Sequence, residues 1–418
     1  MIRPNKNKEI INLWAGDPIY RGFFLCYPAN NKDRYNKKFL VKSVIEGEVL
    51  RAKLLEEKPH YCTATLLDIV TPSPHRVKPP CQYYHQCGGC HYQHIQYNEQ
   101  VYIKQKILKD CLKRIAKINV DLAPPIIGKE WRYRYRGSFK AHGKAIGFYR
   151  EGTRDLISVD RCLLMNDGIN TALRTVNDII PNDYEGEIII IGSKDLAVLF
   201  KPQKPLRVKM NLDTLADRGI NASLSHQQKT PNDNPHRICL NFNNMNYFIS
   251  PFSFFQANWA LNLEVINTIK STVELDKKIV CDLYAGSGNF SIAISDKASF
   301  VYGFEENPHA VSDAINNATV NMINNCKFYC KRAEDIDIRD VIDVMIVNPP
   351  RLGMSKSAMQ RLLKMMPKTI VYMSCDPSTF SRDIKRLIMN YQIQSIRLID
   401  FFPQTYHIET LAILEGLR

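Results

Sequence analysis

The sequence has 418 residues, 45% of them hydrophobic, and a formal net charge of +14. This length is sufficient for two or three domains, and no hydrophobic run approaches the length of a membrane span. The excess of Lys and Arg favours a polyanion as partner, and the N-terminal sequence has no apolar signal core, so we expect a cytoplasmic protein.

Residues 1–75 have the pattern of a small β domain. Short alternating strands are interrupted by Gly47, Pro59 and Pro72, and basic residues lie among them. Small barrels that bind nucleic acids have the same texture. We predict an N-terminal β-barrel with an OB-like fold.

A cysteine-rich segment follows, CQYYHQCGGCHYQH. It places Cys81, Cys87 and Cys90 in one glycine-containing loop, and Cys162 can join them from a central sheet. In a reducing compartment such a cluster favours metal binding over disulfides. Four thiolates suit either zinc or an iron–sulfur cluster, and the spacing alone does not decide between them.

We predict a central α+β domain over residues 76–250. It contains a helix over about 95–120, which could pack on the C-terminal domain, and then the segment EWRYRYRGSF. A strand here would place Arg132, Arg134 and Arg136 on one face, and the tyrosines between them on the other. Arginines and aromatic rings in this arrangement can hold RNA phosphates and stack on bases.

Residues 251–418 predict an α/β domain. Apolar strands fall near 279–282, 301–304, 327–330, 341–347, 368–373, 394–401 and 407–414. Helices fit between the first six strands, and only a short turn separates the last two. This plan predicts a mostly parallel, Rossmann-like sheet of the class I methyltransferase type, closed by one antiparallel hairpin.

A glycine turn follows the first of these strands, in IVCDLYAGSGNF. Gly286 and Gly288 permit the turn, Asn289 opens a helix, and Ser291 stands where the dinucleotide fingerprint would have its third glycine. No lysine follows the glycines, so the turn is not a P-loop. With Glu305 placed to accept hydrogen bonds from ribose hydroxyls, we expect S-adenosylmethionine as the cofactor.

Two further segments carry candidate chemistry. Asn348-Pro-Pro resembles the motif of amino methyltransferases, but Arg351 stands where an aromatic residue usually stacks the target base. Cys375 follows the fifth strand, and Glu409 lies on the last hairpin, with His407 as an alternative base. A thiolate that adds to C6 of uracil makes C5 nucleophilic, and a base must then remove the C5 proton.

The combination resembles the RNA (uracil-5-)-methyltransferase family, in particular its iron–sulfur 23S ribosomal RNA members. The matching segments are SPHRVKPPCQYYHQCGGCHYQH, DRCLLMN, FSFFQANW, DLYAGSGNF, NPPRLG, SCDPSTFSRD and FFPQTYHIE. They occur in the order of the family and cover nearly the whole chain. The resemblance implies methylation of C5 of a uridine in 23S ribosomal RNA by a protein with an N-terminal TRAM domain. For the oligomeric state, a monomer is the simplest expectation.

The resemblance also implies roles for single residues. Cys375 would be the nucleophile and Glu409 the general base. A [4Fe–4S] cluster would be held by Cys81, Cys87, Cys90 and Cys162. The cofactor and target-base site would contain Gln256, Tyr284, Gly286, Asn289, Glu305 and Asn348. The family usually has Asp at the position of Asn348, and an amide can donate as well as accept a hydrogen bond.

Three alternatives remain open from the sequence. The same chemistry could act on a transfer RNA uridine. An amino methyltransferase could use Asn348-Pro349-Pro350, and its product would carry the methyl group on an exocyclic nitrogen. A non-catalytic RNA-binding protein of the same fold would bind RNA without methyl transfer.

Overall fold

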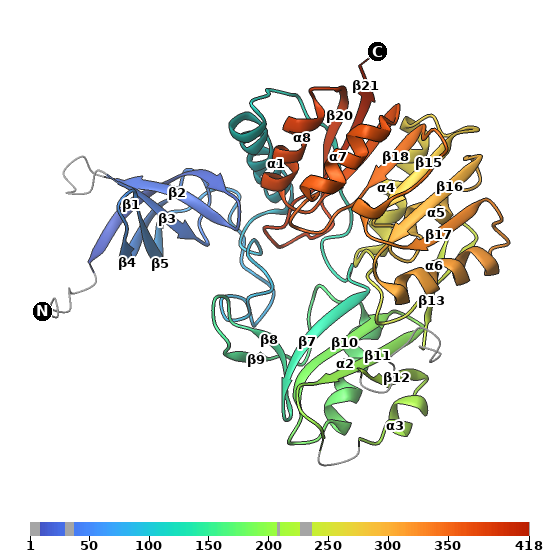
Figure 1. Ribbon diagram of the computed structural model, residues 1–418. Helices are drawn as coiled ribbons and strands as arrows, with labels where there is room; N and C mark the ends of the chain where they lie inside the picture. The colour runs from blue at the N-terminus through green and yellow to red at the C-terminus, as the bar shows by residue number, and fades with distance from the viewer. Residues whose placement is uncertain (1–8, 30–36, 207–209, 226–235, 418) are drawn as a thin grey trace, which may run out of the picture. The chain divides into compact units, whose positions relative to one another are not determined.

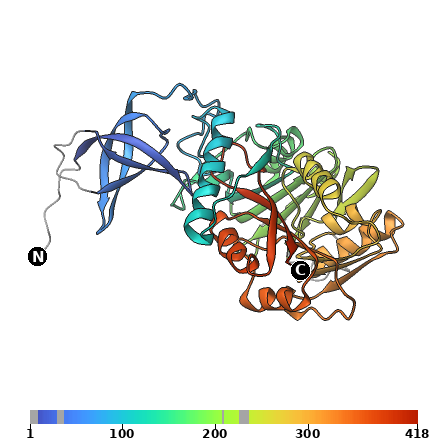
Figure 2. The ribbon, with the colours of Figure 1, turned by 90° about the horizontal axis from the view of Figure 1, so that it is seen from above.

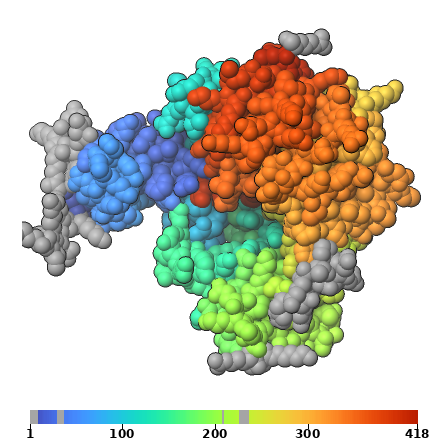
Figure 3. Space-filling view, viewed as in Figure 1, coloured from blue at the N-terminus to red at the C-terminus, as the bar shows by residue number. Residues whose placement is uncertain are grey.

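The computed structural model describes residues 9–29, 37–206, 210–225 and 236–417; the other residues are drawn grey in Figures 1 and 3. The chain divides into two compact units. The first comprises residues 1–110 and 402–407, and the second comprises residues 111–401 and 408–418. Within the described ranges, no helix is long and apolar enough to cross a membrane.

The first unit begins with a closed five-stranded barrel (Figure 1), which agrees with the predicted N-terminal barrel. The strands follow the order β1-β2-β3-β5-β4, and β4 pairs back onto β1. Alternating side chains such as Leu13, Phe24 and Phe39 are fully buried in its core. The strands are β1 (Ile10–Ile19), β2 (Phe23–Pro28), β3 (Lys38–Lys42), β4 (Val49–Glu57) and β5 (Tyr61–Thr71).

The cysteine-rich segment of the first unit is made of turns and leads into α1 (Tyr97–Cys111). It holds the segment 402–407 of the same unit through a set of hydrogen bonds. The carbonyl of Gln404 accepts the N–H groups of His91 and Tyr92, at 2.9 and 3.0 Å. The buried amides of Gln100 and Gln404 also bond to each other at 2.9 Å. Segment 402–407 is therefore fixed by residues far from it in sequence.

The central part of the second unit is a six-stranded sheet of order β12-β11-β10-β7-β8-β9, with α2 packed on β10 and β11. Its elements are β7 (Arg136–His142), β8 (Ala145–Tyr149), β9 (Leu156–Ser158), α2 (Asp167–Ile179), β10 (Glu185–Gly192), β11 (Leu196–Pro202), α3 (Asp213–Ala216) and β12 (Ile220–Leu224). A hairpin follows, formed by β13 (Ile238–Phe242) and β14 (Met245–Ile249).

The predicted strand through the three arginines is wrong. Arg132 has a left-handed backbone, with φ at 56°, and β7 begins only at Arg136. Left-handed residues do not continue a strand, so the arginines do not share one face. Arg132 instead pairs with Asp167 at 3.2 Å on the surface.

The C-terminal sheet confirms the seven predicted strands and their final antiparallel hairpin. Its order is β17-β16-β15-β18-β19-β21-β20-β6. These strands are β15 (Ile279–Leu283), β16 (Phe300–Glu305), β17 (Cys326–Cys330), β18 (Val344–Val347), β19 (Thr369–Ser374), β20 (Tyr391–Ile399) and β21 (Glu409–Gly416). The sequence did not predict the edge strand β6 (Ala123–Ile126), which contains two prolines and pairs with β20.

Helices cover both faces of this sheet, as in doubly wound folds. Seen from above, α4 lies on one side of it, and α7 and α8 lie on the other (Figure 2). The π-helical turn Leu112–Ala116, which ends the predicted helix, contacts α8 within the second unit. The helices are α4 (Trp259–Thr272), α5 (Asn289–Ile294), α6 (Pro308–Val320), α7 (Lys356–Met365) and α8 (Pro377–Leu387).

Candidate active site

The candidate site lies at the carboxyl edge of the C-terminal sheet, where the neighbouring parallel strands β15, β16, β18 and β19 end. Tyr284 follows β15, Glu305 ends β16, Asn348 follows β18, and Cys375 follows β19. The N–H of Asn348 approaches the carbonyl of Leu283 at 3.4 Å, which joins two of these loops. Ligands of open α/β sheets bind at this edge, on either side of the point where the strand order reverses.

The glycine turn is built as the sequence predicts. Gly286 and Gly288 have φ of 56° and 83°, conformations that favour glycine. The N–H of Gly286 donates to one carboxylate oxygen of Glu305 at 3.0 Å, and the N–H of Asn307 donates to the other at 2.9 Å. The turn and the carboxylate therefore position each other, and the carboxylate keeps further lone pairs for a ligand.

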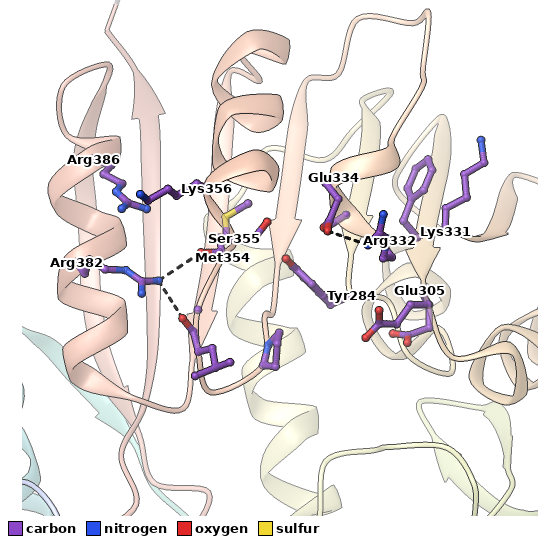
Figure 4. A pocket seen from close by; sticks show the side chains of 16 residues that line it. Tyr284, Glu305, Lys331, Arg332, Glu334, Met354, Ser355, Lys356, Arg382 and Arg386 are labelled. Carbon is purple, nitrogen blue, oxygen red and sulfur yellow. Dashed lines mark hydrogen bonds and ion pairs between the residues drawn. The ribbon is translucent and has the colours of Figure 1, made fainter.

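A cavity of about 460 Å³ opens beside this turn and is lined by Tyr284, Glu305, Glu334, Met354 and Ser355, among others. Figure 4 shows Tyr284 and Glu305 from one side, and Lys356, Arg382 and Arg386 from α7 and α8 on the other. This volume is within the range of small-molecule sites. The predicted ribose acceptor and the tyrosine thus border one nucleoside-sized space.

Two further predicted cofactor residues lie near the turn and have different surroundings. Gln256 is buried in the segment between β14 and α4. The same segment passes the turn, since a side chain at Gly286 would meet the carbonyl of Phe254 at 3.7 Å. Asn289, the first residue of α5, exchanges two amide hydrogen bonds with Asn262 of α4, at 2.7 and 3.1 Å.

The segment that carries Gln256 is fixed from two directions. Asp313 of α6 is fully buried and accepts the Ser253 hydroxyl at 2.6 Å and the Ser250 N–H at 2.8 Å. Arg136 donates to the carbonyl of Ser253 at 2.9 Å, and burial lowers the pKa of its guanidinium to about 10. Arg136 therefore braces this segment, rather than presenting its charge on a strand surface.

The sheet register brings Cys375 and Glu409 together. Ser374 at the end of β19 pairs with Thr410 of β21, and the Thr410 hydroxyl donates to the Ser374 carbonyl at 3.2 Å. In an antiparallel pair the next two positions, Cys375 and Glu409, are then opposite each other. Glu409 is 4% exposed, whereas Cys375 is only partly buried and can be reached from the sheet edge.

The surroundings of this pair favour the protonated forms of both groups. Burial, and then the neighbouring Glu409 carboxylate, raise the pKa of the Cys375 thiol to about 12. Burial raises the pKa of Glu409 to about 8. The charge of Asp376 adds slightly to the rise at Cys375, while its carboxylate caps α8 by accepting the N–H groups of Ser378 and Thr379 at 2.9 and 3.0 Å.

Arg351 is a site residue whose role the sequence did not predict. Its positive charge lowers the pKa of Cys375 and of Glu409, opposing the effect of burial on both. Its carbonyl accepts the Thr379 hydroxyl at 3.2 Å, so the loop after β18 is tied to α8. One feature of the sequence could have indicated this role. Arg351 follows β18 and Cys375 follows β19, so both residues lie at the same edge of the sheet.

Phe254 is a second such residue. Its ring is 63% exposed, although it lies in the segment that passes the glycine turn. An exposed aromatic ring can stack on a planar ligand. The sequence FSFFQANW contains three phenylalanines, and nothing in its pattern showed which ring would face outward.

The four predicted metal ligands fall in different parts of the chain. Cys81, Cys87 and Cys90 belong to the first unit and Cys162 to the second, and all four are half-buried and outside any disulfide. Among the described residues, no group of three or more His, Cys, Asp or Glu side chains is arranged to hold a metal ion. Four thiolates are nevertheless the donor set that an iron–sulfur cluster requires.

Comparison with known proteins shows which family this chain resembles. A model of the family described as tRNA (Uracil-5-)-methyltransferase matches residues 232–416. An uncharacterized RNA methyltransferase of Aquifex aeolicus is 34% identical over 421 residues, with 94% of this chain and 96% of the relative covered. Another from Clostridium acetobutylicum is 31% identical, with 91% of this chain and 92% of the relative covered.

A solved structure is similar over almost the full length. It is the Pyrococcus abyssi tRNA (uracil-54, C5)-methyltransferase in complex with S-adenosyl-L-homocysteine, with a TM-score of 0.75 and 25% sequence identity. The similarity covers 96% of this chain and 99% of that one. The chain therefore belongs to the RNA (uracil-5-)-methyltransferase family.

Proposed function

We propose that the protein transfers a methyl group from S-adenosylmethionine to C5 of a uridine in RNA. The observation that carries this proposal is the pairing of β19 with β21, which sets a reachable thiol opposite a buried carboxyl group. An amino methyltransferase needs neither group. Carbon methylation of a pyrimidine needs both, as nucleophile and as base.

The residues divide the reaction between them. Cys375 first loses its thiol proton to solvent, the resulting thiolate adds to C6 of uracil, and the electron pair of the C5–C6 double bond moves into an enolate. C5 then takes the methyl group, Glu409 removes the C5 proton, and elimination restores both the double bond and the thiolate. Arg351 favours the ionised forms of Cys375 and Glu409, which burial opposes.

The cavity at the glycine turn is the proposed cofactor site. When bound there, S-adenosylmethionine supplies a methyl group activated by its sulfonium charge. Glu305 would accept the ribose hydroxyls, and Tyr284 would border the nucleoside, since both line the cavity. Gln256, Gly286 and Asn348 would complete the site from the surrounding loops, and Asn289 would do so from the start of α5.

Access to the target base requires it to leave the RNA stack. Enzymes that modify a base within folded nucleic acid extrude that base into a pocket. The exposed ring of Phe254 is placed to stack on the extruded uracil or on the base next to it. Asn348 at the same edge offers an amide that can both donate to and accept from a pyrimidine.

The choice of RNA substrate, the RNA-binding role of the barrel and the iron–sulfur cluster are proposed from the sequence resemblance. We propose 23S ribosomal RNA as the substrate, with transfer RNA as the alternative, because the similar Pyrococcus abyssi enzyme is a tRNA (uracil-54, C5)-methyltransferase. We also propose a cytoplasmic monomer whose barrel is an RNA-binding TRAM domain. The resemblance further supports a [4Fe–4S] cluster on Cys81, Cys87, Cys90 and Cys162, in a structural role.

Product analysis tests the proposal. The purified protein is incubated with methyl-labelled S-adenosylmethionine and with 23S ribosomal RNA or transfer RNA transcribed in vitro, and the RNA is digested to nucleosides. We expect labelled 5-methyluridine from one of the two RNAs. Label on an exocyclic nitrogen of adenine or guanine would instead identify an amino methyltransferase, and RNA binding without transfer would contradict an enzymatic role.

A further inference from the structure

A groove on the central sheet lies outside the site described above. Its volume is about 850 Å³, and its lining includes Lys140, His142, Tyr149, Arg154 and Lys201. These residues come from β7, β8, β11 and the turn between β8 and β9. None of them has a part in the chemistry proposed above.

The groove lies on the sheet face opposite α2. Lys140, Glu187 and Lys201 are register partners across β7, β10 and β11, so their side chains project from the same face. Their neighbours Phe139, Ile188 and Phe200 project from the other face and are fully buried, where α2 packs against the sheet.

The charges in the groove leave a positive excess. Glu187 binds Lys140 at 2.8 Å and Lys201 at 3.7 Å, so one carboxylate is shared by two ammonium groups. The other acid of the groove, Glu185, pairs with Lys204 at 3.0 Å. Arg154 is exposed and makes no ion pair within the described part of the chain. One lysine charge and the Arg154 guanidinium therefore remain for an anionic ligand.

An exposed ring accompanies these charges. Tyr149, at the end of β8, is 38% exposed and lines the groove. Cations that hold backbone phosphates, combined with an aromatic ring that stacks on bases, are the components of a site for single-stranded nucleic acid. An acidic peptide would use the cations but would have no need of the ring.

Strand β7 connects the groove to the candidate active site. At its first residue, Arg136 bonds to the carbonyl of Ser253, in the segment that carries Gln256. Lys140 and His142 follow four and six residues later, roughly 13 and 20 Å along the strand at about 3.3 Å per residue. A few nucleotides next to the target uridine can span this distance.

We propose that this groove binds the RNA strand flanking the methylated uridine, with phosphates on Arg154 and Lys201 and a base on Tyr149. The inference rests on the proposed function for the identity of the ligand as RNA. The groove residues position the substrate and take no part in bond making.

Two groove variants and one matched control test the proposal. Arg154→Glu reverses a groove charge, and Tyr149→Ala removes the ring. Arg174→Glu makes the same charge reversal on the exposed side of α2, across the sheet from the groove. There the Arg174 guanidinium donates to the Thr171 hydroxyl of its own helix at 3.2 Å. All three side chains are at the surface, and thermal melting of each variant checks that the fold is kept.

Binding is measured by fluorescence anisotropy with a labelled 20-nucleotide oligouridine over a range of salt concentrations. Arg154→Glu should weaken binding about tenfold and reduce the slope of log K against log salt by about 0.7, the value for one lost phosphate contact on a single strand. Tyr149→Ala should weaken binding about fivefold with the slope unchanged. Arg174→Glu should bind within about twofold of the wild type.

Methylation kinetics separate this inference from the proposed function. These kinetics use an RNA that the wild-type enzyme methylates. With this substrate, the two groove variants should have a higher KM than the wild type and an unchanged kcat. Groove variants that bind the oligouridine like the wild type, or a control that weakens binding as much as they do, would overturn the inference. If the wild type methylates no RNA while the groove variants still lose oligouridine binding, the proposed function fails and the groove assignment stands.

Discussion

Glu409 combines two properties that oppose each other. A general base must be ionised to accept a proton, yet its burial raises the pKa of Glu409 to about 8. Arg351 opposes part of this effect with its positive charge. The raised pKa places the carboxylate near the pH at which it can both bind and release a proton, as expected for a catalytic base.

Activity should therefore rise with pH. Because Glu409 must be ionised to accept the C5 proton and Cys375 must be ionised to attack C6, kcat/KM should increase steeply with pH below pH 8 and less steeply above it, where only the thiol still titrates. Glu409→Gln should lose most activity at every pH. As a control, Glu415→Gln changes an exposed carboxylate on the same strand and should keep the wild-type profile. A wild-type profile that is flat from pH 6 to 9 would contradict this role for Glu409.

The same pKa predicts a dependence of stability on pH. The pKa is higher in the folded chain than in the unfolded one, so the folded state binds more protons between the two values. This contribution to stability is complete below the unfolded pKa of about 4.5, and it falls by about 1.4 kcal/mol per pH unit up to pH 8. Glu409→Gln should therefore melt at a higher temperature than the wild type at pH 9, with little difference at pH 4.

At the scale of elements, the sequence predicted the C-terminal strands well because each is an apolar run between helices. It did not predict β6, whose two prolines are atypical of a strand. It also placed a strand across Arg132, where the chain takes a left-handed conformation. Local alternation cannot show such a conformation, because the tertiary surroundings determine it.

The pairing of Cys375 with Glu409 was only partly predictable. The sequence placed both residues at the ends of strands on one sheet edge. Their direct opposition depends on the register of β19 against β21, which is set by side-chain packing along both strands. The role of Arg351 depends on how the loop after β18 is held to α8, which the sequence does not show.

The cysteine-rich segment holds segment 402–407, which precedes Glu409 in the chain. Residues 91, 92 and 100 of the first unit hold Gln404, and the chain reaches Glu409 five residues later.

If the cysteine-rich segment carries the proposed cluster, protein purified without oxygen should contain about four iron and four sulfide ions per chain. Cys87→Ser should lower both contents, whereas Cys330→Ser, a change at an exposed cysteine of β17, should lower neither. Iron-free wild-type protein would contradict the cluster.

At the scale of the whole molecule, the chain combines a closed barrel, a mixed central sheet and a mostly parallel C-terminal sheet. Patterning predicted the barrel from its short alternating strands and the C-terminal sheet from the alternation of strands and helices. The groove on the central sheet was not predicted, since it arises from side chains that the register of β7, β10 and β11 aligns on one face.

The central claim is that Cys375 forms a transient covalent bond to C6 of the target uracil. The most direct measurement is trapping with RNA that contains 5-fluorouridine, because fluorine at C5 cannot leave as a proton and the adduct persists. With S-adenosylmethionine present, the wild type should give a protein–RNA complex that survives denaturing electrophoresis, and Cys375→Ala should give none. A Cys375→Ala variant that still forms the complex, or that methylates unmodified RNA at the wild-type rate, would contradict the account.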